Sequence, residues 1–394
     1  MWGIRTDLLA GAAFCALFSA PAAAFGLDTI NPLSANFSGL SVTLGGQASA
    51  AGFSADQPSA TGLDQSGASG AATATLNVER DYDSGLSLSL KSAFEVYHDR
   101  LSGDNYGSDL VQKVYGVAQT GLGRVEVGMT DGAAYALAVT GPVVDDATTL
   151  DNPNVTFFRD PTSGQAFINI FSLNSAVESS LNYAKISYYS PRLFGIQLGA
   201  SFTPSEGKDV VPFLNSGPHV ADRQENIWEG ALSYSDSFGP YSLGFYGGLS
   251  VGHDGAKTLG HAGLTDWGLG TEIDYNINDD VKLALGGAYR HANSDAFDIN
   301  AALAQGQTNS AHLSTTLSVG PWIAGVEYGD GTAEGSPKLG VRGYEASVGY
   351  VVNANLQATV GWQRLDYSRD AGTFYNGAPA IRMDAAFLHL KLHV

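Results

Sequence analysis

The segment Leu86-Ser-Leu-Ser-Leu-Lys-Ser-Ala-Phe-Glu-Val-Tyr97 alternates between apolar and polar side chains along most of its length. Its leucines fall on one side of an extended chain, whereas Ser87, Lys91 and Tyr97 fall on the other. Because successive side chains of a β-strand point to opposite faces of the sheet, this segment is predicted to be a strand with one apolar and one polar face. Taken alone, it could be a surface strand of a soluble sheet.

The same alternation recurs to the C-terminus, and the connections between the alternating segments are alternately tight and long. Tight connections such as Tyr82-Asp-Ser-Gly85 contain the residues that short hairpins require, whereas the stretch 53–71 is polar and rich in small residues. Strict alternation places all tight turns at one end of a closed barrel and all long loops at the other, as in outer-membrane barrels. The predicted fold class is therefore an all-β, transmembrane antiparallel β-barrel of 16 strands, with expected ranges 37–52, 72–82, 85–98, 109–120, 122–130, 180–190, 194–204, 225–237, 240–253, 264–276, 280–291, 309–320, 321–330, 341–352, 354–369 and 380–394.

The composition agrees with such a barrel. The 394-residue chain contains 49 Gly, 18 Tyr and 18 Phe but only 3 Met, which suits turns, close strand contacts and interfacial aromatics better than a helical core. After residue 24 no apolar run is long enough for a membrane-spanning helix. The formal net charge is −19, and no basic patch is suited to phosphate, so nucleic-acid binding is not expected.

Residues 1–24 have the features of a cleaved signal peptide. Arg5 supplies the positive end, residues 8–18 are apolar, and Ala22-Ala-Ala24 has the small residues of a cleavage site. Residues 25–394 are then expected to form a single barrel domain. The one cysteine, Cys15, lies in the signal peptide, so the mature chain is expected to have no disulfide and no thiolate metal site.

Two arginines interrupt the alternation, since Arg342 and Arg364 fall on apolar faces. A charge at the bilayer midplane costs about 2–4 kcal/mol. Both arginines are therefore expected near the external rim of the barrel, or at a β-bulge that re-aims them. Trp and Tyr at the ends of apolar faces, such as Trp228 and Trp322, are expected to form the aromatic girdles at the lipid interface.

Residues 131–179 form a long connection without clear alternation, and loops of this length are usually functional. Its apolar clusters, bounded by Gly and Pro, predict that it folds inward and packs against the inner wall of the barrel. Arg159 is its one basic residue, whereas several carboxylates are spread along it.

Two motifs flank this connection, Gly121-Leu-Gly-Arg-Val-Glu-Val-Gly-Met-Thr-Asp131 and Lys185-Ile-Ser-Tyr-Tyr-Ser-Pro-Arg-Leu-Phe-Gly-Ile-Gln-Leu-Gly199. In that order, behind a signal peptide, they resemble the Gram-negative general porin family, particularly its α-proteobacterial members. The resemblance covers essentially the whole mature chain and implies a homotrimer of water-filled barrels, each narrowed by its third loop. It departs at the C-terminus, where family members usually have Phe or Trp and this chain has Val394.

The resemblance also implies a constriction at which acidic loop residues face basic residues of the barrel wall. Carried onto this sequence, the acidic side consists of Asp145, Asp146, Asp151 and Asp160. The basic side consists of Lys91, Arg124, Lys185 and Arg290.

The expected function is passive diffusion of ions and small hydrophilic solutes across the outer membrane of a Gram-negative bacterium. The acidic balance predicts a modest cation preference, and the expected surroundings are outer-membrane lipid and lipopolysaccharide. The alternative is a substrate-specific channel, for sugars or other small solutes, on the same barrel.

Other classes of function are disfavoured. A barrel enzyme lacks support because the eight His are scattered without ligand spacing and no Gly-x-Ser-x-Gly elbow occurs. An adhesin would not need the inward loop. No cofactor is expected, although the run from Asp145 to Asp151 could hold Ca²⁺, which prefers several carboxylate oxygens.

Overall fold

The structure is a computed structural model that describes residues 31–57, 66–98, 111–152, 157–158, 173–205, 224–254, 263–293, 307–334, 338–370 and 378–394. The signal-peptide prediction for residues 1–24 and the candidate Asp160 lie outside these ranges. The strands are β1 (Leu33–Phe37), β2 (Leu40–Asp56), β3 (Ser66–Asp81), β4 (Ser87–His98), β5 (Val111–Thr120), β6 (Gly123–Met129), β7 (Ala184–Tyr189), β8 (Ile196–Ser205), β9 (Gln224–Phe238), β10 (Tyr241–Asp254), β11 (Thr265–Asn278), β12 (Val281–Ala292), β13 (Thr308–Val319), β14 (Trp322–Ala333), β15 (Leu339–Val351), β16 (Leu356–Arg369) and β17 (Ala380–His393).

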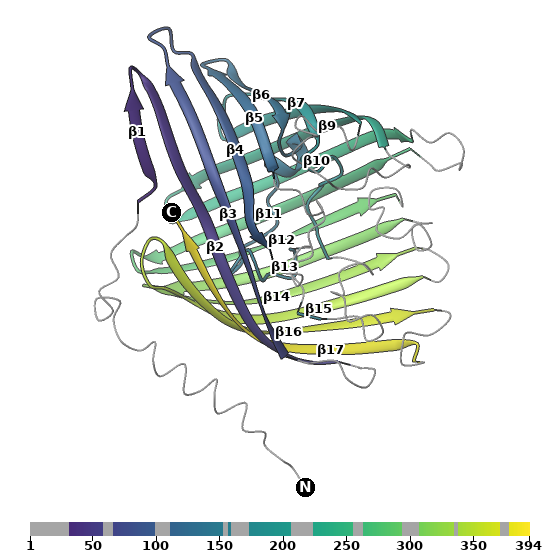
Figure 1. Cartoon of the computed structure of the whole chain (residues 1–394). Helices are drawn as coiled ribbons and strands as arrows, with labels where there is room; N and C mark the ends of the chain where they lie inside the picture. Colours follow the sequence, from purple (N-terminus) through teal and green to yellow (C-terminus); the bar gives the residue numbers. More distant parts are fainter. Residues whose placement is uncertain are drawn as a thin grey trace.

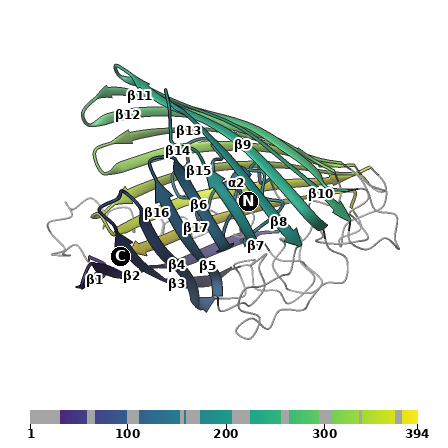
Figure 2. The same ribbon diagram turned by 90° about the horizontal axis from the view of Figure 1, so that it is seen from above.

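Strands β2 to β17 form a closed antiparallel barrel, as the alternation predicts (Figures 1 and 2). Each strand pairs with the next, and β17 closes the ring on β2 through a register that runs from Asp384 opposite Asp56 to His393 opposite Gln47. Every strand therefore has a hydrogen-bonded neighbour on both sides. This arrangement leaves no open sheet edge in contact with lipid.

The short strand β1 was not predicted. It pairs with β2 from Leu33 opposite Leu44 to Phe37 opposite Leu40, and a tight turn at Ser38 and Gly39 joins the two strands. Both turn residues have positive φ, 50° and 83°, as two-residue hairpins of the primed type require. Because the predicted first strand ran straight through position 38, the turn within it was missed. The C-terminus ends beside β1 (Figure 1).

The connections sort by length with one exception. Those after β3, β5, β7, β9, β11, β13 and β15 are tight turns at one end of the barrel, and the longer ones lie at the other end. The exception is the expected long connection 330–340, which is only 334–338 because β14 continues to Ala333 and β15 begins at Leu339. The expected loop 53–71 is shorter than predicted, because β2 continues to Asp56 and β3 begins at Ser66. The small residues of this stretch pair as strand residues, for example Ser54 with Ser66.

The two faces of the wall differ in chemistry. Leu198 and Leu285 point outward and are 52% and 58% exposed, whereas Ser201 and His312 point inward and are 3% and 0% exposed. Two outward aromatic pairs lie at different levels of β14 and β15: Trp322 packs on Tyr350 at the tight-turn end with ring centroids 4.6 Å apart, and Tyr328 packs on Tyr344 near the middle of the two strands at 5.4 Å. Outward aromatic rings at two levels are what aromatic girdles require. No helix within the described ranges is long and apolar enough to cross a membrane.

Arg342 and Arg364 lie on the outer face toward the long-connection end, which agrees with the expected position near the external rim of the barrel. Arg342 bonds Asp330 at 3.2 Å and is also opposite Asp366, which bonds Arg382 at 2.7 Å. A four-residue charged row, Asp330–Arg342–Asp366–Arg382, thus crosses β14–β17 one step beyond the Tyr328–Tyr344 pair. The pairing of β14 to β17 contains no register shift, so no bulge is needed.

Candidate functional site

The chain between β6 and β7 crosses the inner wall of the barrel, and its described residues are here called the crossing segment (131–152, 157–158 and 173–183). It begins with the one-turn helix α2 (Ala133–Ala136), which lies within the ring of strands (Figure 2). The backbone N–H of Ala133 donates to Ser201 Oγ at 3.1 Å, and that of Ala134 to Glu229 Oε2 at 3.4 Å. The inward side chains of β8 and β9 therefore satisfy the first turn of the helix.

After α2 the segment lies over inward glycines of successive strands. A Cβ at Gly270 of β11 would overlap the Val139 carbonyl oxygen, and a Cβ at Gly286 of β12 would lie 2.9 Å from the Cα of Gly141. Further along, the glycines are covered by a side chain of the segment instead of its backbone: the Val144 methyl groups occupy the space over Gly325 of β14 and Gly349 of β15. The missing side chains let the segment lie directly against the wall.

An apolar cluster holds the middle of the segment against β15, β16, β17 and β2. The Phe157 ring stacks on Phe387 at 4.7 Å and packs on Phe53 at 5.5 Å. The members of this cluster are almost fully buried, and they include Leu150, Phe158 and Leu173 of the segment with Val341, Tyr367 and Met383 of the wall. A small hydrophobic core therefore occupies part of the barrel interior.

Two carboxylates of the segment bind the last strand. His389 Nδ1 lies 2.6 Å from Asp145 Oδ2, and the backbone N–H of Ala147 donates to Asp145 Oδ1 at 3.0 Å. Burial disfavours the charged form of Asp145, but the hydrogen bond and charge of His389 outweigh it and lower the pKa of this carboxyl below its usual 3.8. The neighbouring Asp146 pairs with Lys391 and remains 70% exposed.

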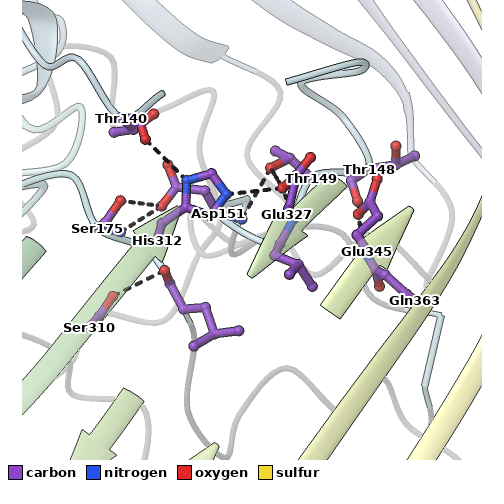
Figure 3. Close-up of polar contacts among 12 residues, drawn as sticks. Thr140, Thr148, Thr149, Asp151, Ser175, Ser310, His312, Glu327, Glu345 and Gln363 are labelled. Carbon is purple, nitrogen blue, oxygen red and sulfur yellow. Dashed lines mark hydrogen bonds and ion pairs between the residues drawn. The ribbon is translucent and has the colours of Figure 1, made fainter. Parts of the chain in front are cut away.

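A second polar contact joins the segment to β13 and β14 (Figure 3). Glu327 Oε2 accepts hydrogen bonds from the Thr149 hydroxyl and the Leu150 N–H, and it lies 3.1 Å from His312 Nε2. His312 Nδ1 is 3.1 Å from the Thr140 carbonyl oxygen. Both ring nitrogens thus face acceptors. A doubly protonated ring would donate from both nitrogens, whereas a neutral ring would donate from only one of them.

The returning limb is held by hydrogen bonds from buried side chains. Ser310 Oγ donates to the carbonyl oxygens of Leu173 and Asn174 at 3.0 and 2.8 Å. Ser175 donates from both N and Oγ to Asp151 Oδ1 at 2.7 Å, which ties the two limbs together. Lys185 of β7 donates to the carbonyl oxygens of Thr130, Ser180 and Leu181, at the two ends of the segment.

The seven sequence-predicted site residues that lie within the described ranges, all except Asp160, do not form one facing set. Asp145, Asp146 and Asp151 each have a different partner, so the run suggested for Ca²⁺ does not converge. No group of three or more His, Cys, Asp or Glu side chains placed for a metal ion occurs in the described ranges.

The four predicted basic residues all face inward but divide into two kinds. Lys185 and Arg290 are buried, and Arg290 forms a bidentate pair with Asp266, at 2.9 and 2.6 Å. Lys91 and Arg124 lie on β4 and β6, where Arg124 is 39% exposed, pairs with Glu126 at 3.0 Å and covers the Tyr189 ring. The described contacts of residues 133–152, 157–158 and 173–179 are with β7–β17 and β2, and none of them involves Lys91 or Arg124.

Sequence reasoning missed His312, Glu327, Glu345, His389 and Lys391. Strand alternation was the available signal: His389 and Lys391 alternate with Leu388, Leu390 and Leu392 and so face inward. What alternation does not indicate is which wall residue the crossing segment reaches.

Comparisons with known proteins agree with the geometry. A family model described as Gram-negative porin matches residues 10–371. Among solved structures, the anion-selective porin from Comamonas acidovorans has a TM-score of 0.55 at 14% identity, covering 90% of this chain and 100% of its own. The outer membrane channel DcaP of Acinetobacter baumannii has a TM-score of 0.59 at 11% identity (93% and 100% coverage), and a mutant of the Rh. blastica porin has 0.51 at 14% (90% and 100%). A search of curated proteins finds no match.

The first prediction concerns the glycines under the segment. Gly270→Ala is expected to lower the free energy of unfolding by about 1–3 kcal/mol, because the new methyl group forces the Val139 carbonyl off the wall. Gly230→Ala is the control, since a Cβ there meets no atom within 4 Å. Urea unfolding followed by tryptophan fluorescence measures both. Equal effects of the two variants would contradict the close approach.

The second prediction concerns the Asp145–His389 contact. A carboxyl whose pKa is lowered on folding contributes stability above its unfolded pKa and loses it as the pH falls through the folded pKa. Asp145→Asn is therefore expected to destabilise the barrel by about 1–3 kcal/mol at neutral pH. The difference from wild type should shrink as the pH falls below about 4. Asp236→Asn, on the outer face, is the control, and unfolding midpoints across pH 2–8 provide the measurement; a difference that persists undiminished at pH 2 would argue against this account.

Proposed function

Because the chain belongs to the Gram-negative porin family, we propose that it forms a water-filled channel through which ions and small hydrophilic solutes diffuse, with a mild preference for cations. The family and the porin-like barrel place it in a Gram-negative outer membrane as a channel. The observation that supports the proposal is the crossing segment, whose described residues lie against the inner wall from β7 to β17 and at β2 and so narrow the interior of the barrel. Solute passage of this kind involves no chemical step.

The charges around that path support the cation preference. The described part of the crossing segment carries Asp131, Asp145, Asp146, Asp151 and Glu178 but no Lys or Arg. Three of these carboxylates form ion pairs, Asp131, Asp145 and Asp146, and the side chain of Asp146 is the most exposed of the three. Fixed negative charge on the wall raises the local concentration of cations. A relative of the same fold is anion-selective by name, so the sign of selectivity depends on each chain's own charges.

Self-association as a homotrimer is supported by the outer face of β2 and β3. In the part of their pairing that runs from Gly46–Ala74 to Ser54–Ser66, the outward residues are all small: Ala48, Ala50, Gly52 and Ser54 on β2, and Ser66, Ala68, Gly70, Ala72 and Ala74 on β3. Other outward surfaces carry large apolar residues such as Leu285 and Trp362. Small residues let sheets or helices approach closely within a membrane, where lipid already solvates large apolar side chains. The three-fold number comes from the family resemblance.

Contact with lipopolysaccharide is supported by the charged row on β14–β17. Arg342, Arg364 and Arg382 bond their carboxylate partners through Nε, which leaves the terminal nitrogens of each guanidinium for phosphate or carboxylate groups of lipid. A cleft of about 680 Å³ lies beside them and is lined in part by Lys338, Arg342 and Arg382. Export to this membrane by a cleaved signal peptide, residues 1–24, belongs to the same proposal.

The third prediction tests the channel. Purified protein in planar bilayers under a KCl gradient is expected to give a reversal potential on the cation-selective side. Asp146→Asn should reduce that potential, because it removes an exposed carboxylate beside the path. Asp236→Asn is the matched control on the outer face. Clear anion selectivity of the wild type would refute the preference, and absence of conductance would refute the channel itself.

Loop removal tests the role of the crossing segment in the same recordings. Replacing residues 140–165 by a short Gly-Ser linker should enlarge the single-channel conductance, because the segment no longer fills one side of the interior. An unchanged conductance would show that the segment does not line the narrowest part of the path.

The fourth prediction tests the assembly. Native mass spectrometry of the detergent-extracted protein is expected to detect three chains with bound anionic lipid. Ala50→Phe should dissociate the complex, since a ring prevents close approach, whereas Ala324→Phe on the lipid-facing side of β14 should leave it intact. Arg342→Gln combined with Arg382→Gln should retain less lipid. A monomeric wild type would contradict the trimer, and unchanged lipid retention would contradict the lipid contact.

A further inference from the structure

A row of side chains with polar groups interrupts the apolar outer surface at the long-connection end of β11–β14. Trp267, His291, Asn309 and Thr332 lie directly opposite one another on these four strands. Each lies within three residues of the end of its strand. They face outward, because Trp267 has the parity of Leu269, which is 58% exposed. These four residues are here called the rim row.

Hydrogen bonds within the rim row determine which of its polar atoms remain free. Asn309 Oδ1 accepts from the hydroxyl of Tyr289, the outward neighbour of His291 on β12, at 2.7 Å, and Asn309 Nδ2 donates to Thr332 Oγ1 at 3.3 Å. His291 Nδ1 lies 2.8 Å from the same Oδ1, so Nδ1 carries a proton and donates it. In a neutral ring His291 Nε2 is then an acceptor. Neither this atom nor the indole N–H of Trp267 has a hydrogen-bond partner in the described part of the chain.

Three aromatic rings form an apolar surface beside these two free atoms. The Trp267 ring packs on Tyr289 with centroids 5.5 Å apart and on His291 at 5.7 Å. Tyr289 remains 39% exposed. An aromatic surface with one donor and one acceptor at its edge fits a sugar ring, which has an apolar C–H face and hydroxyl groups around it.

A tryptophan that serves only as part of a girdle has different neighbours. Trp228 of β9 also faces outward toward the long-connection end, but it lies opposite Phe202 and Val251 and packs on the Phe202 ring at 4.5 Å. Both neighbours are apolar, as contact with acyl chains requires. Trp267 instead lies opposite a histidine, and acyl chains cannot satisfy the polar edge of that ring. The rim row therefore suits the headgroup layer of the membrane.

The surfaces around the rim row match the other parts of a glycolipid. Toward the middle of the membrane lie the outward leucines Leu269 and Leu313, both more than half exposed. At the β14 end of the row, Thr332 lines the cleft that also contains Arg342 and Arg382. Acyl chains thus meet leucines, and phosphate groups meet guanidinium groups, on either side of the surface that fits a sugar.

We propose that the rim row binds the sugar headgroup of an outer-leaflet glycolipid. The sugar lies on the Trp267 and Tyr289 rings, the indole N–H donates to one of its hydroxyl groups, and another hydroxyl donates to His291 Nε2. This inference rests on the lipopolysaccharide contact proposed above, and it adds recognition of sugar to a contact based on charge. A lipid with sugar is preferred over one with phosphate alone, because only the sugar satisfies both free atoms.

The test compares two lipids on the full mature chain in detergent, after removal of bound lipid. Rough lipopolysaccharide carries sugars and phosphate, whereas phosphatidic acid carries phosphate alone. Binding is measured by native mass spectrometry at increasing lipid concentration. Trp267→Leu should weaken lipopolysaccharide binding by roughly tenfold and leave phosphatidic acid binding unchanged. Trp228→Leu is the matched control, since it removes an outward tryptophan with apolar neighbours and should change neither.

A second variant and the lipid comparison make the outcome decisive. His291→Phe keeps a ring but removes the free acceptor; it should weaken lipopolysaccharide binding by about threefold or more, and it serves if Trp267→Leu fails to fold. Unchanged lipopolysaccharide binding in these two variants, or an equal loss in Trp228→Leu, would overturn the sugar site and leave the charge-based lipid contact standing. A wild type that binds neither lipid would overturn both.

Discussion

Closure of the sheet between β17 and β2 is the constraint on which the rest of the molecule depends. In hydrocarbon an unpaired backbone N–H or C=O group costs several kcal/mol, so a spanning sheet can have no free edge. β17 covers β2 from Asp56 to Gln47, and β1 then covers the same edge from Leu44 to Leu40. Between them, Val394 exchanges two backbone hydrogen bonds with Gly46, at 2.9 and 3.0 Å. These bonds do not involve the terminal side chain, so closure does not require an aromatic residue at that position.

Closure also fixes the space into which the crossing segment must fit. The circumference is set by the strands, and the segment can approach the wall only where the wall lacks side chains or offers matching ones. The inward glycines of β11 and β12 meet the first need, and the apolar cluster around Phe157 meets the second. Between these two regions the contacts are polar and buried. Moving the segment would leave a buried polar group without its partner, which costs free energy. This cost holds the segment in one position.

The sequence determined much of this fold in advance because strand alternation is a local signal. It predicted the barrel, the end of the barrel at which each connection lies and the inward direction of Lys91, Arg124, Lys185 and Arg290. It failed where a local feature breaks the period. The register shift between Ala72 and Thr73 places Tyr97 opposite the outward Ala72, although unbroken alternation from Leu86 puts Tyr97 inside.

The partners within the site were beyond sequence reasoning for a different reason. Asp145 meets His389, which is 244 residues away, and Thr149 meets Glu327, 178 residues away. Which pairs form depends on where the crossing segment settles along the wall, and that position results from the glycines and the apolar cluster acting together. Alternation gives the face of each wall residue but not its neighbour across the interior.

The pairing pattern also changes how the net charge of −19 bears on permeation. A carboxylate in a buried ion pair, such as Asp266 with Arg290, has its field cancelled at short range by its partner. Ions in the aqueous path respond mainly to charges exposed to that path, among them Asp146 at 70% and Arg124 at 39% exposure. These two charges have opposite sign. The formal charge of the chain therefore exaggerates the electrostatic bias of the interior, and a preference carried by a few exposed groups is necessarily modest and sensitive to salt.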